Sequence, residues 1–103
     1  MKNQEFKTQT VDFRGTTCVV NRYKYQNGQN CLKLVDLEDW SPYCTASVAY
    51  DVEIGEDEVI IKDYSENSGV MKALVEAKVI EPSHRIIETP FVYLYVCKLT
   101  KNC

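Results

Sequence analysis

The chain has 103 residues, of which 45% are hydrophobic and 26% charged, and its formal net charge is −3. This length is sufficient for one hydrophobic core but not for two, so we expect a single globular domain over residues 1–103. No apolar run approaches the ~20 residues that cross a bilayer, which excludes a membrane protein of the helical class. The first residues lack the apolar stretch of a secretory signal, so we expect a cytoplasmic protein.

The charges are unevenly distributed along the chain. Residues 1–35 contain six basic and two acidic residues, a net charge of +4, and residues 67–103 contain five and three, a net charge of +2. Residues 36–66 contain ten acidic residues and one basic residue, a net charge of −9. This asymmetry bears on partners and solubility rather than on the fold.

The first part of the chain predicts a β-hairpin preceded by a short strand. The expected elements are a strand at Thr8–Phe13, a turn at Arg14-Gly15, a strand at Thr16–Tyr25 and a return strand at Asn30–Asp36. Between the last two, Asn27-Gly28 favours a two-residue type I′ turn, because both residues tolerate positive φ. Alternation along the return strand predicts that Leu32 and Leu34 point inward and that Lys33 points outward.

The later part of the chain predicts further short strands around a single helix. The expected elements are a polar connection at Leu37–Pro42, an alternating strand at Tyr43–Tyr50, an acidic loop at Asp51–Glu58 with Val52 and Ile54 as apolar anchors, strands at Val59–Ile61 and Arg85–Glu88, and a strand at Phe91–Leu99. The last of these is nearly all apolar or aromatic, which is typical of a central strand covered on both faces.

The helix is indicated by a change in apolar spacing after the Val59–Ile61 run. Apolar residues at intervals of three and four predict one buried helical face, made by Val70, Met71, Leu74 and Ala77. Before it, Ser65, Asn67 and Ser68 are each able to accept a hydrogen bond from a free amide at the helix start. Pro82 stops any continuation of the helix.

These elements predict an α+β fold, a mainly antiparallel sheet of five or six strands with one α-helix packed on it. Strands lie both before and after the helix, which argues against a doubly wound parallel sheet. An uncovered sheet edge in such a fold can pair with a second copy of the chain or with a partner strand. We therefore expect a homodimer through a sheet edge as one mode of association.

The search for catalytic chemistry gives no constellation, so we predict a protein that is not an enzyme and has no cofactor and no metal. The five cysteines are odd in number and widely spaced, which favours reduced, buried thiols over a disulfide framework: Cys18, Cys31, Cys44, Cys97 and Cys103. His84 is the only histidine and is predicted to be an inert, exposed loop side chain. The four glycines are scattered singly, so no glycine-rich phosphate cradle is present.

The acidic middle segment is the predicted partner-binding site. Its candidate contact residues are carboxylates with two aromatic side chains between them: Asp36, Glu38, Asp39, Trp40, Tyr43, Glu56, Asp57 and Glu58. Complementary charge speeds the encounter with a basic protein, and aromatic side chains supply binding anchors. The competing interpretation is a solvated acidic face with Trp40 tucked beneath a loop.

Nucleic-acid binding is the alternative function. The Arg22–Tyr25 stretch interleaves basic and aromatic residues, and with Lys33 on the neighbouring strand it has the composition of a surface that stacks bases and contacts phosphates. Three cations are few for this purpose, and the overall acidity of the chain argues against an unaided nucleic-acid binder. We therefore rank nucleic acid below protein as a partner.

One stretch resembles a known family. The segment Ile61-Lys62-Asp63-Tyr64-Ser65-Glu66-Asn67-Ser68-Gly69-Val70-Met71-Lys72-Ala73-Leu74-Val75, together with the hairpin Tyr25-Gln26-Asn27-Gly28, resembles a family of short uncharacterised bacterial proteins encoded by phages and mobile genetic elements. One departure is Lys78, where such a helix end favours glycine. The resemblance implies an accessory protein that inhibits a host defence nuclease, an inhibitor of the anti-CRISPR or anti-restriction type. The resemblance identifies no catalytic residue in this chain.

Overall fold

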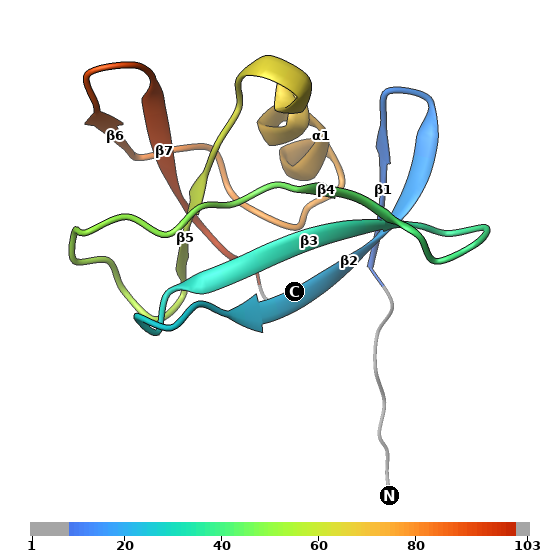
Figure 1. The fold of residues 1–103 in the computed structure, drawn as a ribbon, viewed down its shortest axis with the longest axis horizontal. Coiled ribbons are helices and arrows are strands. Elements are labelled where there is room, and N and C mark those ends of the chain that lie inside the picture. The colour runs from blue at the N-terminus through green and yellow to red at the C-terminus, as the bar shows by residue number, and fades with distance from the viewer. Residues whose placement is uncertain (1–8, 101–103) are drawn as a thin grey trace, which may run out of the picture.

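The computed structural model describes residues 9–100, which form seven strands and two helical segments (Figure 1). In chain order these are β1 (Thr10–Phe13), β2 (Thr16–Lys24), β3 (Asn30–Asp36), β4 (Pro42–Thr45), β5 (Glu58–Ile61), the 3₁₀ helix η1 (Ser65–Asn67), α1 (Val70–Glu76), β6 (Arg85–Glu88) and β7 (Tyr93–Lys98). The α+β class is confirmed. Neither helical segment has the length and apolarity that crossing a bilayer requires.

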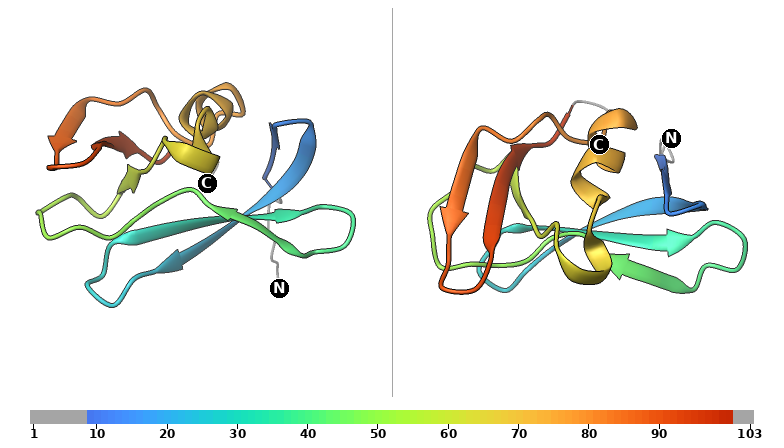
Figure 2. Two further views of the ribbon diagram at one scale, coloured as in Figure 1. Left: turned by 45° about the horizontal axis from the view of Figure 1, so that its top comes forward. Right: turned by 90° about the horizontal axis from the view of Figure 1, so that it is seen from above.

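The strands form two antiparallel sheets, in the orders β1-β2-β3-β4 and β5-β7-β6, and the prediction of one sheet of five or six strands is therefore wrong. Figure 2 shows the two sheets packed at an angle to each other, with α1 next to the three-stranded sheet and over one face of the four-stranded sheet. The predicted strand Tyr43–Tyr50 is confirmed over Tyr43–Thr45, but its extension to Tyr50 is wrong, because β4 ends at Thr45. Beyond it, the Ala46 N–H donates to the Leu32 carbonyl (2.9 Å) and the Val48 N–H donates to the Ile60 carbonyl (3.0 Å). This segment thus crosses from one sheet to the other.

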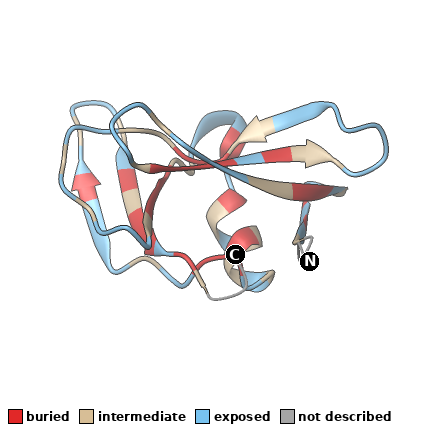
Figure 3. Ribbon diagram, turned by 90° about the horizontal axis from the view of Figure 1, so that it is seen from below, coloured by how far each residue is buried: buried red, intermediate tan, exposed pale blue. Residues whose placement is uncertain are grey.

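The core has two parts, one on each side of the three-stranded sheet. The larger part lies between the two sheets and α1 and includes Leu32, Leu34, Ile61 and Leu74. The smaller part lies on the other face of the three-stranded sheet and consists of Ile60, Ile87, Leu94 and Val96, against which Val48, Val52, Ile54 and Val92 pack. Because both faces of the three-stranded sheet are covered, the consecutive residues Val59, Ile60 and Ile61 of β5 are all buried, whereas burial alternates along β1 (Figure 3). The central position of β7 and the anchoring of the acidic loop by its apolar residues are both confirmed.

The predicted β2–β3 hairpin is confirmed, but its turn has a different geometry. The Gly28 N–H donates to the Tyr25 carbonyl (2.9 Å) and the Tyr25 N–H donates to the Gln29 carbonyl (2.8 Å), which closes a three-residue loop. Gly28 has a φ of 88°, whereas Asn27 does not have a positive φ, so this is not a type I′ turn. The Asn27 side chain instead accepts the N–H of Gln29 at 3.0 Å.

The start of α1 is capped by a residue that the sequence did not indicate. The carboxylate of Asp63 accepts the N–H groups of Gly69 (2.7 Å) and Met71 (3.0 Å), so the expected caps at Ser65, Asn67 and Ser68 are wrong. Asn67 is buried and donates to the carbonyl of Thr45 at 2.7 Å. A carboxylate before the helix satisfies free amides and complements the helix dipole.

The C-terminus of α1 ends in a capping motif that usually contains glycine. Lys78 has a φ of 62°, and its N–H donates to the Val75 carbonyl (3.0 Å), while the Val79 N–H donates to the Leu74 carbonyl (3.0 Å). These two bonds are those of a Schellman motif, and the accompanying apolar contact is supplied by Leu74 and Val79, both fully buried. The motif therefore forms without glycine.

Candidate functional site

The eight predicted site residues fall into two groups near opposite ends of β3. The first follows that strand (Asp36, Glu38, Asp39, Trp40, Tyr43) and the second leads into β5 (Glu56, Asp57, Glu58). The side-chain amide of Asn30, at the start of β3, donates hydrogen bonds of 2.8 Å to the carbonyls of Glu56 and Glu58, whereas Asp36 is the last residue of the strand. The seven residues of β3 span about 20 Å, so the structure does not bring the two groups together.

In the second group, the carboxylate of Glu58 is bonded within the fold. Its Oε1 accepts the N–H of Gly55 at 2.7 Å, its Oε2 lies 2.6 Å from Nε2 of His84, and its side chain is 19% exposed. The Gly55 N–H, followed by the contact with His84, lowers the pKa of Glu58. Asp57 is exposed and forms only a loose ion pair with Lys98 at 3.8 Å. Of the three acidic residues, only Glu56 and Asp57 are therefore available to a partner.

His84 is the residue that sequence reasoning missed. The His84 N–H donates to the Val96 carbonyl (3.2 Å), although Val96 is already the register partner of Arg85. Two consecutive residues thus oppose one, which is a β-bulge, and bulges redirect side chains. His84 and Glu58 are 26 positions apart, and no local sequence pattern signals such a pair.

Four residues of the first group lie in the β3–β4 connection, residues Asp36–Ser41, which we call the Trp40 loop; the fifth, Tyr43, lies in β4. Backbone bonds close it: the Asp36 N–H donates to the Ser41 carbonyl (2.9 Å), and the Trp40 N–H donates to the Asp36 carbonyl (2.8 Å). The carboxylate of Asp36 accepts the N–H of Glu38 at 2.8 Å, and that of Asp39 accepts both the N–H (3.0 Å) and the hydroxyl (2.7 Å) of Ser41. These bonds hold the loop in one conformation.

Trp40 lies near the end of this loop in an unusual conformation. Its φ is 62° and 61% of its surface is exposed. The left-handed region is unfavourable for a residue with a bulky side chain. The structure therefore excludes the interpretation in which Trp40 is tucked beneath a loop.

Tyr43 is held differently from Trp40. In the β3–β4 register, Leu34 opposes Cys44 and Val35 opposes Pro42, which leaves Tyr43 as the extra residue of a bulge. Its ring makes an edge-to-face contact with buried Phe13, with 6.2 Å between the centroids and an interplanar angle of 87°. Tyr43 is thus partly packed on the core, and 38% of it is exposed.

The carboxylates of the Trp40 loop have no cationic partner among residues 9–100. The ion pairs in this part of the chain are His84–Glu58 and Lys98–Asp57, both in the second group. The hydroxyl and N–H of Ser41 lower the pKa of Asp39, so that carboxyl is fully ionised at neutral pH. The loop therefore presents negative charge that no cation among the described residues neutralises within salt-bridge distance.

The basic and aromatic residues of the nucleic-acid alternative are divided between two faces of the sheet. Tyr23 is 51% exposed, and Nζ of Lys33 lies 5.5 Å from the centroid of its ring. Arg22 and Lys24 alternate with Tyr23 along β2 and so lie on the opposite face. The hydroxyl of Tyr25 contacts Ser47 at 3.1 Å, and burial raises the pKa of Tyr25 to about 12. These residues do not form one continuous basic surface.

The remaining nucleophilic and metal-binding groups are not arranged as a site in the described residues. Burial raises the pKa of Cys18 to about 11, that of Cys97 to about 12, and that of Cys44 in the same direction. Few of these thiols are ionised at neutral pH, and the thiolate is the reactive form. Residues 9–100 contain no group of three or more His, Cys, Asp or Glu residues that could hold a metal ion.

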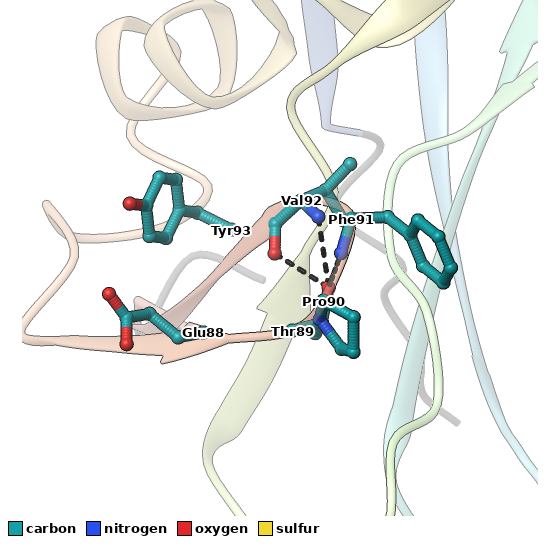
Figure 4. A pocket seen from close by; sticks show the side chains of 6 residues that line it. All are labelled: Glu88, Thr89, Pro90, Phe91, Val92 and Tyr93. Carbon is teal, nitrogen blue, oxygen red and sulfur yellow. Dashed lines mark hydrogen bonds between the residues drawn. The ribbon is translucent and has the colours of Figure 1, made fainter.

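Two surface hollows flank the β6–β7 hairpin. One, of about 570 Å³, is lined by Met71, Ser83, His84, Arg85, Ile86 and Tyr95. The other, of about 390 Å³, lies at the hairpin turn and is lined by Glu88, Thr89, Pro90, Phe91, Val92 and Tyr93. In Figure 4 the side chains of Glu88 and Tyr93 project to one side of the hairpin, whereas Phe91 projects to the other. Neither hollow contains a cysteine, so His84 has no thiol beside it there.

Comparisons with protein-family models, with curated protein sequences and with solved structures return no match to this chain. The resemblance to short phage and mobile-element proteins therefore stays a prediction. The case for a function depends on the geometry of the chain itself.

Proposed function

We propose that this protein is a small, non-enzymatic protein-binding module that contacts its partner through the Trp40 loop. The observation that carries the proposal is that Trp40 is both 61% exposed and held at a φ of 62°. A positive φ is unfavourable for a bulky residue by about 1–2 kcal/mol, and such strain is concentrated at functional positions. Tryptophan is also enriched among the residues that dominate binding energies.

The chemistry of the loop specifies the kind of partner. Trp40 requires an apolar pocket, and the neighbouring carboxylates of Glu38 and Asp39 favour lysine or arginine side chains around that pocket. Because the loop is closed by its own hydrogen bonds, little conformational entropy is lost when it binds. In this proposal the partner is a basic protein in the cytoplasm. The more specific form of the proposal is a phage or mobile-element inhibitor of a host defence nuclease, of the anti-CRISPR or anti-restriction type.

A capture experiment with matched variants tests the proposal. The full chain is immobilised, bacterial lysate is passed over it, and retained proteins are quantified by mass spectrometry for wild type, for Trp40→Ala and for the double variant Glu38→Gln with Asp39→Asn. The matched control is Glu56→Gln with Asp57→Asn, which removes the same charge from the second acidic group. It leaves Glu58, and so the fold, intact.

We expect wild type and the control to retain the same basic protein, and the two Trp40-loop variants to lose it. Trp40→Ala should weaken binding at least thirtyfold, since truncating such an anchor costs about 2 kcal/mol or more. Retention should also fall as salt is raised. A DNA-cleavage assay of the captured protein then tests the nuclease assignment. Equal retention by wild type and Trp40→Ala would reject the Trp40 loop as the contact.

Nucleic-acid binding is kept as a second candidate because of one contact. Lys33 lies over the exposed ring of Tyr23 beside a hollow of about 340 Å³ that Tyr43 also lines, and an aromatic ring with a cation can stack a base and contact a phosphate. Retention of the protein on a single-stranded DNA column, reduced by salt and by Tyr23→Ala, would favour this function. Retention that Tyr23→Ala leaves unchanged would contradict it.

A further inference from the structure

Strand β6 is an unpaired edge of the three-stranded sheet. In the described part of the chain it pairs with β7 alone, and it lies at the outer margin of that sheet (Figures 1 and 2). The Thr89 N–H donates to the Val92 carbonyl, and hydrogen-bonded pairs alternate along an antiparallel ladder. The peptide groups of Ile86 and Glu88 are therefore directed away from β7. An edge of this kind can pair with another strand.

The surface next to this edge is apolar. Ile86 is 58% exposed and Tyr93 is 54% exposed. The register pairs Ile86 with Tyr95 and Glu88 with Tyr93, so these four side chains lie on one face of the sheet. An added strand would lie beside β6 in the plane of the sheet, where its backbone would satisfy the free peptide groups and its side chains would pack next to Ile86, and the two hollows beside β6 leave room for these side chains.

The charges along β6 favour antiparallel pairing of this edge with the same strand of a second copy of the chain. The strand begins with the cation of Arg85, preceded by His84, and ends with the anion of Glu88. Antiparallel self-pairing centred on Ile86 places the basic end of each copy next to the acidic end of the other, with His84 opposite Glu88, whereas in-register parallel pairing places Arg85 beside Arg85 and Glu88 beside Glu88. An isologous interface needs a self-complementary surface of this kind.

We propose that two copies of this protein associate through β6, with Ile86 opposite Ile86 of the second copy. This register joins the free peptide groups of the two edges and makes a continuous six-stranded sheet. It also buries the two exposed Ile86 side chains against each other. Pairing centred on Glu88 would instead bring like charges together. The Trp40 loop lies at the far end of the molecule from β6 (Figure 1), so both loops of the dimer stay accessible.

Cysteine cross-linking tests the register. In a hydrogen-bonded antiparallel pair the two Cα atoms are about 5.5 Å apart, which a disulfide can join. Ile86→Cys should therefore form a disulfide-linked dimer under mild oxidation. In the same register the two Glu88 positions are four residues apart along the strand, about 13 Å, so Glu88→Cys is the matched control that should not cross-link. Both substitutions are made in a Cys103→Ser background, because Cys103 lies outside the described residues.

Sedimentation equilibrium over a concentration series tests the association itself. A strand of four residues forms a small interface, so we expect a weak dimer, with a dissociation constant on the order of 10 μM. Ile86→Lys, at an exposed position, should keep the circular dichroism spectrum of wild type and raise the dissociation constant more than tenfold. Trp40→Ala should not change it, which separates this proposal from the proposed function. A monomer at every concentration, an unaffected dimer in Ile86→Lys, or equal cross-linking of Glu88→Cys would overturn the proposal.

Discussion

The two acidic groups of this protein look alike in the sequence and differ in the structure. Both are short runs of carboxylates, and both lie near an end of β3. In the Trp40 loop, the carboxylates of Asp36 and Asp39 accept hydrogen bonds from their own loop and form no ion pair with any of residues 9–100. In the second group, Glu58 bonds to Gly55 and to His84 and so connects the start of β5 to the start of β6.

The comparison shows that the role of a carboxylate depends on the donors that the topology places near it. Where only local N–H and hydroxyl groups are available, the charge stays on the surface and can contact a partner. Where the backbone N–H of Gly55 and the distant imidazole of His84 come close, the same residue type holds two parts of the fold together. Acidic composition alone does not distinguish these two outcomes.

The largest expected effect follows from removing Asn30, the residue that holds the backbone of the second acidic group. Asn30 is 2% exposed, and its amide is bonded to the carbonyls of Glu56 and Glu58. Asn30→Ala should lower the free energy of unfolding by about 3 kcal/mol, because the carbonyls of Glu56 and Glu58 lose their donor and the buried Asn30 side chain leaves a gap. Urea denaturation measures this. Asn27→Ala removes one exposed turn bond and is the control, with an expected loss of under about 1 kcal/mol.

The next effect concerns Glu58 and its dependence on pH. Glu58→Ala should lower the free energy of unfolding at pH 7 by about 2 kcal/mol, as expected for a charged hydrogen-bonded group, whereas the exposed Asp57→Ala should have little effect. The pKa of Glu58 is lowered from its ordinary value of 4.5, first by the Gly55 N–H and then by His84. The Glu58 carboxylate therefore contributes fully to the free energy of unfolding above pH 4.5, the pKa of an ordinary glutamate. This contribution is lost as the pH falls through the lower pKa that Glu58 has in the folded protein.

Denaturation of wild type and Glu58→Ala across pH 2 to 7 measures this dependence. The difference in stability between the two proteins should decrease in acid. A difference that stays constant down to the lowest pH would show that the Glu58 carboxylate is not what joins β5 to β6.

A smaller effect of opposite sign is expected in the Trp40 loop. Trp40→Gly should raise the free energy of unfolding by about 1 kcal/mol, because glycine adopts a φ of 62° without the steric penalty of a side chain. Trp40→Ala keeps a Cβ and should show no such gain. If Trp40→Gly raises the free energy of unfolding and loses partner binding, then the conformation of Trp40 destabilises the fold and is needed for binding the partner. A loss of stability in Trp40→Gly would instead place Trp40 among the structural residues.

The smallest effect is on the ionisation of Asp39. Ser41→Ala removes the hydroxyl that bonds to Asp39, so the pKa of Asp39 should rise toward its ordinary value of 3.8. The thermal midpoint should stay that of wild type, because the loop is exposed. An NMR titration of the Asp39 carboxyl measures the shift. An unchanged pKa would show that the loop is not held closed by this side chain in solution.

Much of the local structure could be predicted from the sequence. The β2–β3 hairpin, the helix beginning at Val70 and the strand Arg85–Glu88 follow from alternation, apolar spacing and turn residues, which depend on neighbours in the chain. The errors concern which of several polar side chains forms a given hydrogen bond. Asp63 caps the helix in place of three nearer candidates, and Asn67 is used instead to bond β4.

The amino-acid sequence alone indicates an α+β protein with one amphipathic helix, a net charge of −9 over residues 36–66 and two aromatic residues, Trp40 and Tyr43, in the first part of the candidate site. Only the tertiary structure decided that the strands divide into two sheets, because the residues after Thr45 leave β3 to bond β5. The tertiary structure also decided that the carboxylate of Glu58, unlike those of the Trp40 loop, is bonded to His84. Both outcomes depend on hydrogen bonds between residues more than ten positions apart, and no local pattern encodes such bonds.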